Sequence, residues 1–146
     1  MKFSLLSVIT FICLFTKAQA PNLAEAKSYA KENHKLILLE FSGSDWCIPC
    51  IRMEKEIFQK ESFINYSKEH LVLLHADFPR LKKHQLAKKQ AKNNEELAEK
   101  YNKEGAFPYT VLLDADGKVL KQWDGMVATS AQEFIKQIQP FTGANN

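Results

Sequence analysis

The sequence has few cysteines and no second cysteine pair. Of its three cysteines, Cys13 lies in an apolar N-terminal stretch, and the other two are Cys47 and Cys50. Two cysteines three residues apart cannot form the set of several disulfides that staples small exported domains together. They also supply only two of the four ligands that zinc normally takes. The histidines lie at positions without companion spacing: His34, His70, His75 and His84. We therefore expect no metal and no cofactor, and the cysteine pair becomes the candidate for chemistry.

The sequence also lacks an apolar run of the roughly 20 residues that a membrane-spanning helix needs. The longest candidate, Phe3 to Phe15, follows Lys2 and precedes Ala18-Gln19-Ala20, which has the small-x-small form of a cleavage site. Residues 1–20 are therefore predicted to be a secretory signal peptide cleaved after Ala20, and residues 21–146 one domain. A retained anchor is the alternative. Cys13 leaves a lipoprotein open, although the residues before it are not the small ones expected of a lipidation site.

An excess of charge of one sign is nearly absent once the predicted signal peptide is removed. Loss of Lys2 and Lys17 lowers the formal net charge from +3 to +1, so nucleic acid is not an expected partner. Nothing in the sequence indicates oligomerisation, and we expect a monomer. The basic residues nevertheless cluster in one stretch: Arg80, Lys82, Lys83, His84, Lys88, Lys89 and Lys92. This stretch is either a solvated helix face or a docking surface for an acidic partner.

Hydrophobic periodicity predicts an α/β domain without repeats or linkers. The expected elements are a helix over 22–33, a strand over 36–41, a helix over 50–68, a strand over 71–76, a helix over 85–103, strands over 110–113 and 119–123, and a helix over 130–139. In the long second helix, Met53, Ile57, Phe58 and Ile64 are expected to face inward. Strands separated by helices imply parallel neighbours, and the final hairpin around Asp114-Ala115-Asp116-Gly117 adds an antiparallel edge. We therefore expect a central mixed sheet of about four strands flanked by helices.

Trp46-Cys47-Ile48-Pro49-Cys50 follows the apolar strand directly and opens the next helix. Two thiols at this spacing can close into a disulfide and reopen. Unpaired backbone N–H groups at a helix N-terminus favour a thiolate on the first cysteine, and the thiolate is the species that attacks a disulfide. A structural disulfide and a zinc site are the alternatives for this pair.

Together, the spaced motifs resemble the thioredoxin superfamily over roughly residues 35–140. The resemblance rests on Leu39-Glu40-Phe41 before the cysteine motif and on Phe107-Pro108-Tyr109-Thr110 before the hairpin. Asp45-Trp46-Cys47, followed by Cys50 and Met53-Glu54-Lys55-Glu56, is similar to exported thioredoxin-like proteins and to the C-terminal domain of the DsbD family. The resemblance implies a thioredoxin fold.

The same resemblance implies roles for individual residues. Cys47 would attack the client disulfide as the more exposed thiol, and Cys50 would release the mixed disulfide, so that Cys47 and Cys50 form a redox-active disulfide. The matching proline of the family, here Pro108, has a cis peptide bond and faces the cysteine pair; a plain strand-entry proline is the alternative. The candidate substrate-binding residues are Trp46, Ile48, Pro49, Phe107 and Pro108, with the Phe107 backbone pairing with an extended substrate.

Glu40 is a carboxylate in an otherwise apolar strand, which is costly unless the group is partnered or protonated. Many family members have a buried acid here, behind the resolving cysteine. Glu40 is therefore a third catalytic candidate, which would help to deprotonate Cys50. A Glu at a sheet edge paired with a Lys is the alternative.

The predicted activity is that of an exported, periplasmic thiol-disulfide oxidoreductase. Ile48-Pro49 has no His to hydrogen-bond a thiolate, as the most oxidising members have, so a reductase is favoured. Its expected partners are client proteins with disulfides or thiols and a membrane electron donor of the DsbD type. An oxidase or isomerase with the same site, and a non-catalytic binding module, remain alternatives.

Overall fold

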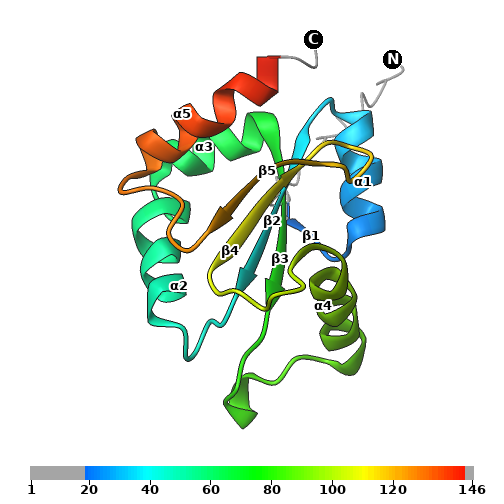
Figure 1. The fold of residues 1–146 in the computed structure, drawn as a ribbon. Helices are drawn as coiled ribbons and strands as arrows, with labels where there is room; N and C mark the ends of the chain where they lie inside the picture. Colours follow the sequence, from blue (N-terminus) through cyan, green and yellow to red (C-terminus); the bar gives the residue numbers. More distant parts are fainter. Residues whose placement is uncertain (1–18, 144–146) are drawn as a thin grey trace, which may run out of the picture.

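Two apolar segments of equal length form the centre of the sheet. In the computed structural model, which describes residues 19–143, β2 (Leu36–Ser42) pairs in parallel with β3 (Leu71–Asp77) (Figure 1). All seven residues of β2 are buried, because β3 and β4 flank this strand and helices cover both faces of the sheet. The predicted strand is therefore confirmed, and it is buried on both of its faces.

The other elements follow the predicted order. They are β1 (Gln19–Ala20), α1 (Leu23–Glu32), α2 (Ile48–Met53), the π-helical turn η1 (Glu54–Phe58), α3 (Glu61–His70), the 3₁₀ turn η2 (Lys82–His84), α4 (Lys88–Tyr101), β4 (Tyr109–Leu113), β5 (Val119–Asp124) and α5 (Ala131–Thr142). None of the helices within residues 19–143 is long and apolar enough to cross a membrane.

The sheet is mixed, as predicted, with the strand order β1-β3-β2-β4-β5. β4 runs antiparallel to both β2 and β5, so the C-terminal hairpin joins the sheet directly beside β2. The two-residue strand β1 pairs with β3 at the other edge and was not predicted. It consists of the last two residues of the predicted signal peptide, so cleavage after Ala20 would remove it and leave four strands. Residues 1–18, including Cys13, lie outside the described residues.

Side chains alternate between two apolar cores, one on each face of the sheet. α1 and α4 cover one face, whereas α2, η1, α3 and α5 cover the other (Figure 1). Leu39 and Phe41 belong to the first core, and Leu36 and Leu38 belong to the second. By the same alternation, Glu40 points to the α2 face.

The predicted single helix over 50–68 is wrong. The chain is helical from Ile48 to Phe58, breaks at Gln59 and Lys60, and resumes as α3 from Glu61. Lys60 has extended backbone angles, and the π-helical turn before it changes the rotation of the chain. The inward positions therefore shift by one residue in α3, where Phe63 is 1% exposed and the predicted Ile64 is 37% exposed.

The helix expected over 85–103 is shorter than predicted, because α4 begins only at Lys88. The preceding segment from Phe78 to Ala87 forms a loop with one 3₁₀ turn instead. This loop returns to the turn after β2, where Asp45 accepts hydrogen bonds from two of its backbone N–H groups. It thereby becomes part of the surroundings of the cysteine motif.

Candidate active site

Cys47 and Cys50 form a disulfide at the N-terminus of α2, with their Cα atoms 5.2 Å apart. Cys47 is the N-cap residue, and its Sγ accepts a hydrogen bond from the backbone N–H of Cys50 at 3.3 Å. Cys47 is 4% exposed and Cys50 is 1% exposed. The order of exposure is the predicted one, but both residues are buried in this closed form. The hydrogen bond to Sγ is the local contact that would stabilise a Cys47 thiolate.

Trp46 is held firmly beside the first cysteine. Its Nε1 donates a hydrogen bond to the carbonyl oxygen of Phe78 at 2.7 Å, and its ring meets Phe107 edge to face at 5.4 Å. A Cβ atom at Gly43 would overlap the indole ring, so the strand-to-helix turn needs glycine at that position. Gly43 is a residue that the sequence reasoning missed.

The Phe107–Pro108 peptide bond is cis, and Pro108 is buried. The carbonyl oxygen of Pro108 accepts a hydrogen bond from the N–H of Gly125, which ties the residue before β4 to the end of β5. Phe107 contacts both Trp46 and Phe78 through edge-to-face ring packing. The segment that carries Pro108 and the cysteine motif are therefore joined by one aromatic cluster.

The two residues between the cysteines lie on the surface. Ile48 is 73% exposed, the largest value among the exposed large hydrophobic residues within 19–143, and Pro49 is exposed as well. An exposed apolar side chain directly after Cys47 is suited to contact with an incoming apolar peptide.

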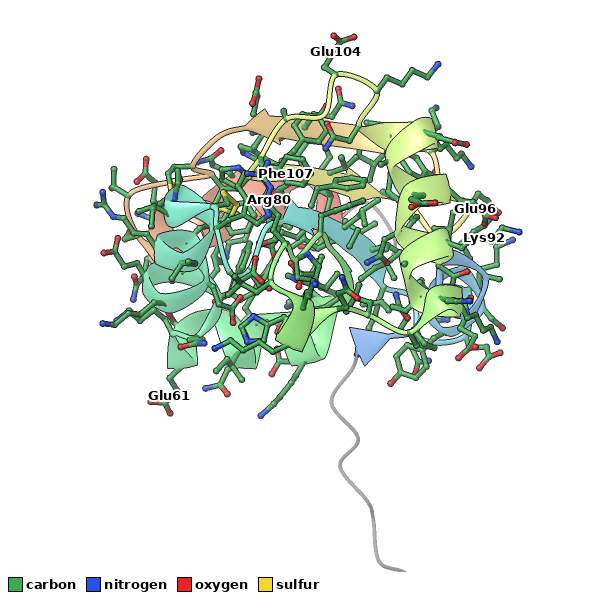
Figure 2. The ribbon with its side chains drawn as sticks, turned by 90° about the horizontal axis from the view of Figure 1, so that it is seen from below. Glu61, Arg80, Lys92, Glu96, Glu104 and Phe107 are labelled. Carbon is green, nitrogen blue, oxygen red and sulfur yellow. A yellow bond between two sulfur atoms is a disulfide. The ribbon has the colours of Figure 1, made fainter. Side chains whose placement is uncertain are left out.

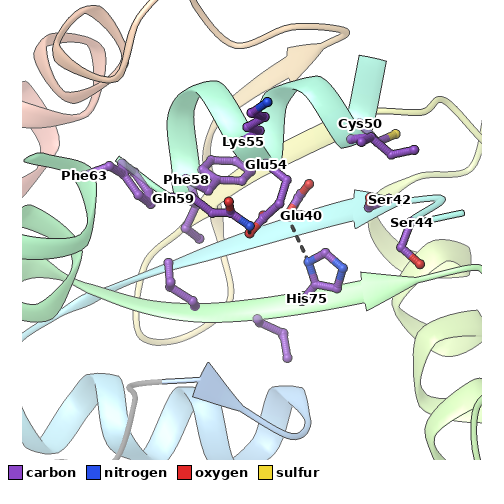
Figure 3. Close-up of a pocket in the computed structure, with 14 residues that line it drawn as sticks. Glu40, Ser42, Ser44, Cys50, Glu54, Lys55, Phe58, Gln59, Phe63 and His75 are labelled. Carbon is purple, nitrogen blue, oxygen red and sulfur yellow. Dashed lines mark hydrogen bonds and ion pairs between the residues drawn. The ribbon is translucent and has the colours of Figure 1, made fainter. Parts of the chain in front are cut away.

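Glu40 lies beneath the helix that carries Cys50. It is 6% exposed, and it lines a pocket of about 570 Å³ together with Cys50 and His75 (Figure 3). β2 is an interior strand, and the partner of Glu40 is His75, with Oε2 and Nδ1 2.9 Å apart. The alternative of an edge position and a lysine partner is therefore wrong.

Burial raises the pKa of Glu40, although the hydrogen bond and charge of His75 act in the opposite direction. Burial acts to lower the pKa of His75, but the hydrogen bond and charge of Glu40, together with the charges of Asp77 and Glu54, outweigh it, so the net direction is upward. A hydrogen-bonded pair in which both pKa values are raised readily takes up a proton.

His75 is the second residue that the sequence reasoning missed. The strands begin with the matching patterns Leu36-Ile37-Leu38-Leu39-Glu40 and Leu71-Val72-Leu73-Leu74-His75, and they pair in parallel from their first residues. Glu40 and His75 are therefore direct neighbours. The shared pattern of four apolar residues and one polar residue was a signal that could have found the pair.

Thr110 extends this polar row to a third strand, since it pairs with Glu40 in the antiparallel register of β2 and β4. Oε1 of Glu40 and Oγ1 of Thr110 are both buried without a hydrogen-bond partner among residues 19–143. One carboxylate oxygen thus remains free to exchange a proton at this site. Within the same residues, no group of three His, Cys, Asp or Glu side chains could hold a metal ion.

The fold and the site define a class: a thioredoxin-like domain with a Cys-x-x-Cys disulfide at the start of a helix and a cis-proline before the third long strand. Residues 23–141 match the sequence profile of the thioredoxin-like domain family, and the chain belongs to this family.

The chain is also similar to individual proteins of known name or structure. The chain is 42% identical over 102 residues to disulfide bond reductase DsbH of Chlamydia pneumoniae; the match covers 70% of this chain and 60% of that relative's length. It is also similar to a solved structure described as DsbH oxidoreductase, with 32% identity, a TM-score of 0.73, and coverage of 94% of this chain and 93% of that chain. The C-terminal domain of DsbD from Neisseria meningitidis, at 19% identity, a TM-score of 0.52, and coverage of 84% and 91%, shares the fold.

Proposed function

We propose that this chain is an exported thiol-disulfide oxidoreductase that reduces disulfides of client proteins in the periplasm. The observation that carries the proposal is the Cys47–Cys50 disulfide at a helix N-terminus, with the buried Glu40 on the wall of the pocket that Cys50 lines. The likeness to a disulfide bond reductase supports the same activity.

The reaction begins from the dithiol form. The Cys47 thiolate attacks one sulfur of the client disulfide, the client S–S bond breaks, and a Cys47–client mixed disulfide forms as the first client thiolate leaves. Cys50 then attacks Sγ of Cys47, which forms the Cys47–Cys50 disulfide and releases the second client thiolate. Two electrons pass from the dithiol to the client.

Cys50 must lose its proton before it attacks, and Glu40 is the proposed acceptor. A carboxylate whose pKa is raised by burial matches a thiol better than an exposed carboxylate does. His75 stabilises the product of this transfer, because the pair then holds a carboxylate and an imidazolium. The His75 side chain is 31% exposed, so it can return the proton to solvent.

The substrate groove is proposed to lie beside Cys47. Its walls are Trp46, Ile48 and Pro49 on one side, and Phe107 and Pro108 on the other. The Phe107 backbone would pair with an extended client segment.

The proposal also covers how the chain is exported and how it receives electrons. Residues 1–20 act as a signal peptide that is cleaved after Ala20, and residues 21–146 act as a monomer. The compartment outside the inner membrane is kept oxidising, so regeneration of the dithiol needs a reduced dithiol partner. A membrane donor of the DsbD type would supply it.

The decisive measurement is the reduction potential of Cys47–Cys50 by equilibration with glutathione. A reductase should lie below roughly −230 mV, towards thioredoxin. A value of roughly −120 to −180 mV would contradict the reductase and favour an oxidase or isomerase with the same site. A Cys47→Ser variant that fully replaces the natural protein in cells would favour a non-catalytic binding module.

A further inference from the structure

The segment after β3 is strongly basic. Between Asp77 and Glu95 the sequence contains no Asp or Glu, whereas it contains six Lys and Arg residues together with His84. The structure divides this stretch into two parts. Arg80, Lys82 and Lys83 lie in the loop before α4, and the remaining three lysines lie on α4.

The loop is fixed to the turn that carries Cys47. The carboxylate of Asp45 accepts hydrogen bonds from the backbone N–H groups of Arg80 and Leu81, each at 2.9 Å. Its Oδ2 also lies 3.0 Å from Nδ1 of His84, and the Asp45 side chain is only 3% exposed. The hydrogen bonds from these backbone N–H groups hold the pKa of Asp45 below its usual value, so it stays ionised and keeps these contacts. The loop is therefore a fixed wall of the active site.

Arg80 has a position that its neighbours in the loop do not share. Its guanidinium carbon lies 3.6 Å from the centre of the Trp46 ring, so the side chain stacks on the residue next to Cys47. Trp46 also contacts Phe107, and Figure 2 shows Arg80 and Phe107 together, with Lys92 well separated from them.

The charge of Arg80 is available to a ligand. Arg80 is exposed, and no carboxylate among residues 19–143 forms an ion pair with it. The nearest acid along the turn, Asp45, is already occupied by the loop backbone and His84. A guanidinium stacked on an aromatic ring still presents its N–H edge, and this planar set of donors matches a carboxylate.

We propose that Arg80 binds an acidic side chain of the client, so that the protein prefers disulfides whose cysteine lies within a few residues of Asp or Glu. The inference rests on the proposed function and adds a class of substrate to it. One partly exposed charge-assisted hydrogen bond corresponds to a preference of roughly three- to tenfold.

The test uses three disulfide-linked peptides that are the same except for Glu, Gln or Lys near the cysteine. The wild-type protein should reduce the Glu peptide with the highest kcat/KM and the Lys peptide with the lowest. Arg80→Gln should remove this order, so that its rates with the three peptides become similar. Arg80→Lys keeps the charge but loses the planar donors, and it should keep only part of the preference.

Lys92→Gln is the matched control, because it removes one basic residue of the same stretch away from Trp46 and should leave the order unchanged. Equal rates for the three peptides, or an order that persists in Arg80→Gln, would overturn the inference alone. Loss of turnover with every peptide would instead contradict the proposed function. Fluorescence anisotropy with the cysteine replaced by serine in each peptide then tests the Arg80 preference as binding, without redox chemistry.

Discussion

Leu39 and Glu40 are neighbours in β2, but they point to opposite faces of the sheet. Leu39 is fully buried in the core under α1 and α4, within a cluster of buried apolar and aromatic side chains. Glu40 is almost as deeply buried under α2, where it pairs with His75 and lines a pocket with Cys50.

The two faces of the sheet therefore differ in the residues that they bury. The α1 and α4 face is filled mainly by apolar packing, which removes apolar area from water, and its buried Asn94 donates a hydrogen bond to the carbonyl oxygen of Asp77. The α2 face contains a row of three polar residues, His75, Glu40 and Thr110, among apolar neighbours. Buried polar groups with unsatisfied atoms reduce stability, so the position of Glu40 in the pocket that Cys50 lines favours a chemical role.

The largest expected effect on activity comes from substitution of Cys47, on the face of the sheet that carries the cysteines. Cys47→Ser should lower disulfide reduction to the uncatalysed background, since Cys50, the remaining thiol in residues 21–146, is only 1% exposed. The measurement is peptide disulfide reduction with a chemical reductant in excess. Cys50→Ser serves as a comparison, because without added reductant it should accumulate the mixed disulfide that Cys47→Ser cannot form. A mixed disulfide that accumulates in Cys47→Ser and not in Cys50→Ser would show that the assigned order of attack is wrong.

Substitutions on the opposite face of the sheet should lower the stability of the protein without changing its redox chemistry. Leu39→Ala is expected to lower the free energy of unfolding by about 2–5 kcal/mol, because it leaves a cavity in a packed core. Urea denaturation measures this change, and the reduction potential should match that of the wild type. The milder Ile37→Val, on the same face, should cost about 0.5–1.5 kcal/mol and serves if Leu39→Ala does not fold. A shifted potential in a folded variant would mean that the two faces are coupled.

Glu40→Gln should slow the release of client from the Cys47 mixed disulfide by about tenfold or more at neutral pH, because the amide cannot accept the Cys50 proton. Rapid mixing of the dithiol protein with a client disulfide, with fluorescence detection, measures the decay of the mixed disulfide. Glu54→Gln is the control, since Glu54 lines the same pocket but is not paired with His75. A rate that does not change in Glu40→Gln would rule out proton transfer through this residue.

The smallest expected effect is a dependence of stability on pH. The pKa of Glu40 is raised above its ordinary value of 4.5, and that of His75 above 6.5, so the folded protein binds more protons than the unfolded chain. Stability contributed by these groups is complete below the ordinary values and is lost as pH rises through the raised ones. The free energy of unfolding should therefore fall as pH rises above about 4.5 and again above about 6.5, where the unfolded chain loses these protons before the folded protein does.

The control for this prediction is the double variant Glu40→Gln, His75→Gln, which removes both titrating groups. Its unfolding free energy, measured by urea denaturation at the same pH values, should change less with pH than that of the wild type. Parallel pH profiles for the two proteins would show that the pair does not gain protons on folding.

Much of the fold could be predicted because local patterns carry it. The apolar runs at Leu36 and Leu71 predicted the central strands, and Asp114 to Gly117 predicted the hairpin turn. The break at Lys60 could not be predicted, since no proline or glycine marks it. It follows from the packing of α3 on α5, which places Phe63 against Phe134 at 5.7 Å between ring centres.

The candidate site divides in the same way. Site residues that lie close together in the sequence, such as Cys47 and Cys50, could be recognised from their spacing. The polar partners of the site are far apart in sequence: 35 residues separate Glu40 from His75, and the same number separates Asp45 from Arg80. Sequence reasoning placed Arg80 in a basic stretch but could not place it on Trp46.

By itself, the sequence determined the order of strands and helices, the cysteine pair at a helix start, and a proline before the final hairpin, because each depends on residues close together in the chain. Only the tertiary structure decided that Glu40 meets His75, that Asp45 holds the loop after β3, and that Arg80 covers Trp46. These contacts depend on strand register and on the path of a loop, which many distant residues determine together. A buried carboxylate and a stacked guanidinium acquire their chemical character from such surroundings.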